Sequence, residues 1–77
     1  MNSIKIWFTN PTFHSIYQRV LLTLDYLEEV GERPEVEQSL TKDLEQMKKW
    51  IYGSLERQTI VSECLIRYES IQQKRQP

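Results

Sequence analysis

Apolar residues recur every three or four positions from Pro11 to Gln73. This spacing is typical of amphipathic α-helices, in which residues three and four apart share one face. A chain of 77 residues is long enough for one small domain. We therefore expect an all-α fold in which helices pack on helices, with residues 1–77 forming a single helical domain.

The first ten residues have a different pattern. Ile4, Ile6 and Phe8 occupy every second position, which is the period of an extended strand. Pro11 restricts the residue before it to extended backbone and ends the segment. We therefore expect residues 1–10 to form a short extended apolar arm. The arm could pack on its own helices, pair with its twin in a dimer or add to a partner's sheet.

The first helix is expected over residues 11–31. Pro11 suits the first turn of a helix because its missing N–H would have no partner there. Either Asn10 or Thr12 can provide the capping side chain. Gly31 can adopt the left-handed conformation that ends many helices.

This first helix is apolar on two sides. One face carries six apolar residues: Phe13, Ile16, Tyr17, Val20, Leu24 and Leu27. Leu22, Tyr26 and Val30 fall on the opposite side. Such a helix is either central in its bundle or makes contact with a second partner.

A second helix is expected over residues 34–57. The connection before it is short, which favours an antiparallel hairpin with the first helix. Pro34 suits a first turn, and Glu35 and Glu37 are favourably placed near the positive end of the helix. Its apolar stripe comprises Val36, Leu40, Leu44, Met47, Trp50, Ile51 and Leu55.

Two continuations are open after Arg57. A turn near Gln58 and Thr59 would give a third helix over residues 59–73, and Gly53 slightly favours a bend. Without a turn, the second helix would continue to the polar tail at 74–77. The fold is thus an antiparallel helical hairpin extended to a three-helix bundle, or a short helix packed on one long helix.

The amino-acid composition argues against a disulfide, a zinc site and a membrane-spanning segment. Cys64 is the only cysteine, so no intramolecular disulfide can form, and with the single His14 it supplies too few ligands for a zinc site. No apolar run is long enough to span a membrane, and no signal-peptide core is present, which favours the cytoplasm.

Catalytic patterns are also missing from the sequence. Ser15 follows His14 directly, and neighbouring residues of a helix point about 100° apart, so the two cannot form a dyad. Cys64 is expected to be a structural thiol. With only Gly31 and Gly53 in the chain, there is no glycine-rich phosphate loop. We expect no enzymatic activity, no cofactor, no bound metal and no small-molecule substrate.

Acidic residues crowd the region from Asp25 to Glu37. Their spacing does not match a calcium-binding loop. We interpret them as a solvated end of the hairpin, with a docking patch for a basic partner as the alternative.

The chain has more apolar helix surface than one small core can absorb. This surplus predicts a small non-enzymatic interaction module, such as an adaptor, a dedicated chaperone or an inhibitor, that binds another protein or a second copy of itself. The residues expected to bind the partner are Trp7, Leu22, Tyr26, Val30, Tyr52, Leu65, Ile66 and Tyr68.

The alternative function is a small helical DNA-binding transcriptional regulator. Its candidate contacts are Arg57, Arg67, Lys74 and Arg75 near the C-terminus. The net charge of −1 argues against it, because DNA-binding proteins normally present a concentrated basic surface. Binding to nucleic acid is therefore disfavoured.

Overall fold

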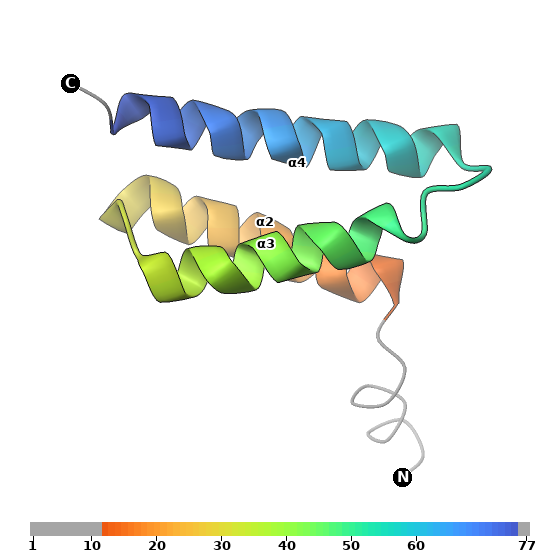
Figure 1. Ribbon diagram of the computed structural model, residues 1–77, viewed down its shortest axis with the longest axis horizontal. Coiled ribbons are helices and arrows are strands. Elements are labelled where there is room, and N and C mark those ends of the chain that lie inside the picture. Colours follow the sequence, from red (N-terminus) through yellow and green to blue (C-terminus); the bar gives the residue numbers. More distant parts are fainter. Residues whose placement is uncertain (1–11, 76–77) are drawn as a thin grey trace, which may run out of the picture.

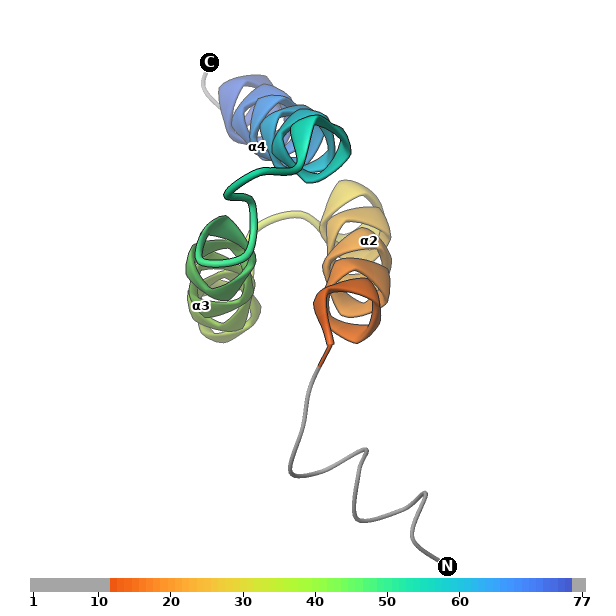
Figure 2. The ribbon, with the colours of Figure 1, turned by 90° about the vertical axis from the view of Figure 1, so that its right-hand side faces the viewer.

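The computed structural model describes residues 12–75, in which all regular structure is helical. The helices are α2 (Phe13–Val30), α3 (Pro34–Lys48) and α4 (Leu55–Lys74) (Figure 1). α2 and α4 run in the same direction and α3 runs in the opposite direction (Figure 1). Viewed end-on, the three helices lie at the corners of a triangle, and each contacts both others (Figure 2). The all-α prediction is confirmed, while the expected arm at residues 1–10 lies outside the described residues.

Capping side chains and a glycine determine where α2 begins and ends. The Thr12 hydroxyl accepts a hydrogen bond from the Ser15 N–H at 3.1 Å, and the Ser15 hydroxyl accepts one from the Thr12 N–H at 3.0 Å. This reciprocal capping box starts the helix at Phe13, two residues later than expected. Gly31, with a φ of +83°, follows the last helical residue, and its N–H donates to the Leu27 carbonyl at 3.0 Å.

The expected end of the second helix was wrong. α3 stops at Lys48 instead of continuing to residue 57, and α4 begins at Leu55. The intervening turn includes Gly53 at a φ of +73°, a conformation that glycine adopts readily. Ser54 then caps α4 by accepting a hydrogen bond from the Arg57 N–H at 3.2 Å.

The break therefore falls at residues 49–54 and not near Gln58, and a single long helix is excluded. Side chains of α4 satisfy carbonyls in this turn. The Gln58 amide donates to the Ile51 carbonyl at 3.2 Å, and the Arg57 guanidinium donates to the Trp50 carbonyl at 3.1 Å. Both carbonyls lie beyond the end of α3 at Lys48, where no continuing helix supplies them with N–H partners.

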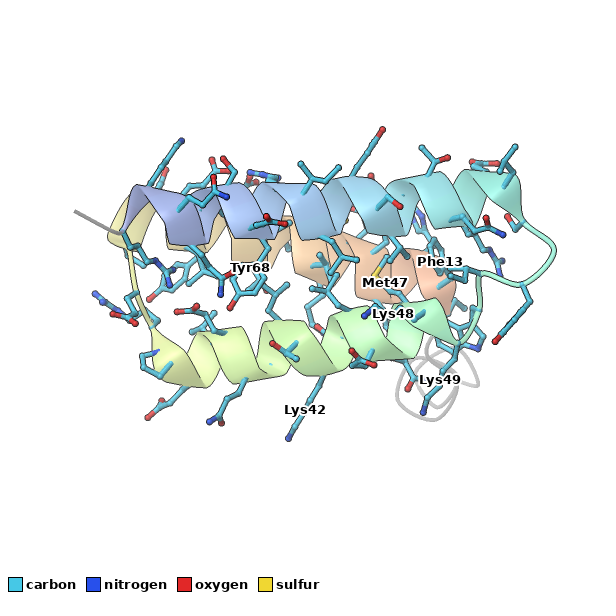
Figure 3. The ribbon with its side chains drawn as sticks, turned by 45° about the horizontal axis from the view of Figure 1, so that its top comes forward. Phe13, Lys42, Met47, Lys48, Lys49 and Tyr68 are labelled. Carbon is cyan, nitrogen blue, oxygen red and sulfur yellow. The ribbon has the colours of Figure 1, made fainter. Side chains whose placement is uncertain are left out.

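The core lies along the common axis of the three helices. Its buried residues are Phe13, Ile16, Val20, Leu24, Leu27, Leu40, Leu44, Met47, Val61, Cys64 and Ile71. Figure 3 shows Met47 in the space enclosed by the helices, whereas Lys42 of the same helix points away from them. Leu55 was expected in the buried stripe of the second helix, but it is the first residue of α4 and is 78% exposed.

A buried carboxylate joins α2 to α3. Asp43 is only 8% exposed, and its two oxygens accept hydrogen bonds from Nε and Nη2 of Arg19 at 2.8 and 2.7 Å. The contact is a bidentate, charge-assisted pair, which is a strong form of hydrogen bonding in proteins. The Arg19 side chain is 64% exposed, so its guanidinium stays largely hydrated and loses little solvation free energy on folding.

Candidate protein-binding surface

α2 carries a row of exposed apolar side chains on its outer side. Leu22, Tyr26 and Val30 are 69%, 45% and 37% exposed. Because they are spaced four residues apart, they lie along one side of the helix and extend over about 12 Å. We call these three residues the outer row of α2. The two-sided apolar character of this helix, inferred from the sequence, is therefore present in the fold.

Contacts of neighbouring residues locate the outer row. Glu28 faces α4, because its carboxylate accepts a hydrogen bond from Nε of Arg67 at 2.8 Å. Tyr26 lies about 160° around the helix from Glu28 and so points away from α4. Arg19, seven residues before Tyr26, shares its side of α2 and reaches Asp43 of α3. The outer row therefore runs along the α3 side of the outer surface of α2.

The exposed apolar residues of α4 form a separate face. Ile66 is 66% exposed and Leu65 is 36% exposed. Leu65 lies about 160° around α4 from Arg67, which is the residue that contacts α2. Leu65 thus points away from α2. Leu65 and the outer row of α2 therefore face in different directions, and the role of both in binding stays a prediction.

The remaining expected contact residues have different environments. Tyr52 is 90% exposed, in the turn between α3 and α4. Tyr68 is partly buried against the core, between α4 and α3, and its hydroxyl donates to Oε1 of Glu37 at 2.8 Å (Figure 3). Tyr68 is therefore less accessible to a partner than Tyr52, and its part in binding stays a prediction. Trp7 lies outside the described residues.

Glu37 of α3 connects this helix to the C-terminal end of α4. Its Oε1 also accepts a hydrogen bond from Nη1 of Arg75 at 2.8 Å, and its Oε2 accepts one from the Arg33 N–H at 3.1 Å. Burial favours a higher pKa for Glu37, but hydrogen bonds from Arg75, Tyr68 and the Arg33 N–H outweigh it and lower the pKa. Nε and Nη2 of Arg75 are buried without a hydrogen-bond partner among the described residues.

Carboxylates border the outer row of α2. Asp25 and Glu28 both bind the guanidinium of Arg67, which lowers the pKa of Glu28. Glu29 and Glu32 are exposed and form no ion pair within residues 12–75. Glu29, beside Tyr26, therefore leaves a negative charge next to the outer row.

His14 and Cys64 lie in opposite environments. His14 is exposed in the first turn of α2. Cys64 is buried at 4% exposure, and burial raises the pKa of its thiol, so little nucleophilic thiolate forms near neutral pH. Within residues 12–75, no group of three or more His, Cys, Asp or Glu side chains is positioned to hold a metal ion.

The helices also lack the features of a membrane span. None of α2, α3 and α4 is long and apolar enough to cross a bilayer. Comparisons with known protein families, with curated proteins and with solved structures found no match to this chain.

Proposed function

We propose that this protein is a small non-enzymatic interaction module that binds another protein through the outer apolar faces of its helices. The exposure of the outer row of α2 supports this proposal most directly. Complete burial of a fully exposed leucine side chain is worth about 1.5–3 kcal/mol. Leu22, at 69% exposure, has the largest share of this still to gain, and Val30, at 37%, has less. Tyr26 adds an aromatic side chain of the type enriched among residues that dominate binding energy.

The helical scaffold suits this role. We propose that the antiparallel hairpin of α2 and α3, extended by α4 to a three-helix bundle, holds the outer row of α2 in a fixed arrangement. Leu24 and Leu27, on the opposite side of the same helix, are almost completely buried and anchor it. A partner therefore meets a preformed surface, which reduces the entropy lost on binding. An adaptor, a dedicated chaperone or an inhibitor could use such a surface.

The ion pairs that Arg67 and Arg75 form within the protein disfavour the DNA-binding alternative. Arg67 is bound by two carboxylates and Arg75 by the carboxylate of Glu37. A phosphate group would have to displace these internal partners before it gained either guanidinium. Over the whole chain the basic side chains do not outnumber the acidic ones, since the net charge is −1.

Site-specific photo-crosslinking tests the proposed function. A photoreactive phenylalanine analogue is introduced into the full chain at Leu22 or at Ile66, and each variant is irradiated in extract of the source cells. Lys42 is the matched control position, because it is exposed and points away from the other two helices (Figure 3). We expect a discrete protein adduct from at least one of the apolar positions and none from the control.

A second copy of the chain or a different protein in that adduct would each support a binding role, and mass spectrometry distinguishes them. Absence of any adduct at both apolar positions, or equal adducts at all three positions, would contradict the proposal. Circular dichroism of each variant checks that its helix content is unchanged.

A further inference from the structure

We propose that the outer row of α2 receives an amphipathic helix of a partner protein whose apolar ridge is flanked by lysine or arginine. This inference rests on the proposed function and specifies the chemistry of the partner. It follows from two properties of the surface: the spacing of its apolar residues and the charge beside them.

The spacing fits a helix as the partner. Leu22, Tyr26 and Val30 form a narrow straight row of about two helical turns. A partner helix presents residues at positions i, i+4 and i+7 as a ridge of similar length, and helices pack by placing such ridges alongside each other.

The charges are unequal on the two sides of the row. Asp25 lies three residues after Leu22, and Glu29 lies three residues after Tyr26, so both border the same side of the outer row. Asp25 shares the single guanidinium of Arg67 with Glu28. Glu29 has no ion-pair partner in the part of the chain that the structure describes. Lys74 also lies close enough to Glu28 to lower its pKa, so the negative charge left unbalanced on this side is that of Glu29.

The other side offers no balancing charge. Arg19 borders the row towards α3, but its guanidinium is held by both oxygens of Asp43. At the end of the row, Glu32 is adjacent to Arg33, so this pair adds no net charge. Cationic side chains on the flank of a partner helix complement the resulting field, whereas anionic ones are repelled.

The same charges disfavour a second copy of the chain as the partner. An antiparallel pairing of two α2 helices about a two-fold axis through Tyr26 would place each flank beside the same flank of the other copy. Asp25 and Glu29 would then lie near their own equivalents, and like charges across an interface are unfavourable. A partner of the opposite charge avoids this repulsion.

A peptide library tests the inference. Its members are 18-residue helix-forming peptides with a fixed leucine ridge and flanking positions randomised between lysine and glutamate, displayed on phage and selected on the full-length protein. We expect the selected flanks to be strongly enriched in lysine. Selected flanks without enrichment, or enriched in glutamate, would overturn the proposal.

Variants of the protein then locate the site. The neutral pair Leu22→Ser and Tyr26→Ser should weaken a selected lysine peptide by at least about tenfold, since each side chain contributes buried contact area. Glu29→Gln should weaken it by about two- to fivefold in low salt and have less effect in high salt. Ile66→Ser, on the α4 face, should leave the affinity unchanged. An equal loss with Ile66→Ser, or no loss with the α2 pair, would overturn the proposal.

The two proposals can fail separately. If crosslinking captures a partner at Ile66 and the α2 variants have no effect on that capture, the binding function stands and the α2 site is wrong. If sedimentation equilibrium shows a dimer that Tyr26→Ser dissociates, the outer row binds a second copy, and the basic partner helix is wrong.

Discussion

Leu22 and Leu24 lie two residues apart on α2 and have opposite environments. Leu24 has no exposed surface, whereas Leu22 is 69% exposed. A separation of two residues turns a side chain by about 200° around a helix, so the two leucines belong to opposite rows. The comparison shows that helical spacing identifies a helix reliably but does not distinguish a row that makes the core from a row that remains available for a partner.

The largest expected effect tests this pair of leucines directly. Leu24→Ala should lower the free energy of unfolding by about 3–5 kcal/mol, because it removes buried methyl groups and leaves a cavity. Leu22→Ala should change it by less than about 0.5 kcal/mol, as is usual for exposed positions. Urea unfolding followed by circular dichroism measures both. Similar losses from the two substitutions would show that the outer row is covered in the folded protein.

Glu37 and Glu29 extend the comparison to charged residues. Glu37→Ala should cost about 1–3 kcal/mol, because the Tyr68 hydroxyl and the Arg75 guanidinium lose a partly buried acceptor. Glu29→Ala, at an exposed position without an ion pair in the described chain, should change stability little. Equal midpoints for the two variants in urea unfolding would mean that Glu37 does not connect the helices.

Lowering the pH should remove part of the contribution that Glu37 makes to the free energy of unfolding. Its pKa in the folded protein is lower than the usual value of about 4.5, so folding is favoured by the ionised form. The stabilisation is present above the pKa of the unfolded chain and is lost as the pH falls through the folded pKa. The unfolding free energy of the wild type should therefore decrease more between pH 6 and pH 3.5 than that of Glu37→Gln. Parallel pH profiles would contradict this assignment.

The smallest expected effect concerns the ion pairs on the surface. Arg67→Ala should cost less than about 1 kcal/mol, because Asp25 and Glu28 are largely solvated and exposed ion pairs contribute little. The loss should shrink further in 0.5 M salt, where such pairs are screened. Thermal unfolding at two salt concentrations measures it. A larger cost that persists in high salt would indicate that Arg67 supports the packing of α4 on α2 through its aliphatic part.

Local signals in the sequence were sufficient for part of the fold. Gly31 correctly located the end of α2, and Pro34 correctly located the start of α3. The end of α3 was missed because Trp50 and Ile51 continue the apolar spacing beyond Lys48. The turn depends on Gly53 together with hydrogen bonds from the Arg57 and Gln58 side chains to backbone carbonyls. No single residue in the sequence indicates this combination.

The candidate site was predictable to a similar extent. The outer row of α2 followed from its position opposite the larger apolar face. The inward position of Tyr68, in contrast, depends on how α4 is rotated against α3, which residue spacing does not determine. Asp43 was also missed, although it follows Leu40 by three residues and precedes Met47 by four, and so lies on the buried face of α3.

The pairing of Asp43 with Arg19 restricts how α3 can slide along α2. A shift by one helical turn, about 5.4 Å, would keep leucines in contact with leucines but would leave the carboxylate in the interior without its guanidinium. Hydrophobic contacts alone tolerate such a shift, because one leucine can replace another. A single acidic residue thus selects one alignment among several of comparable apolar burial, and it thereby sets where along the bundle the exposed leucine and tyrosine of α2 are presented.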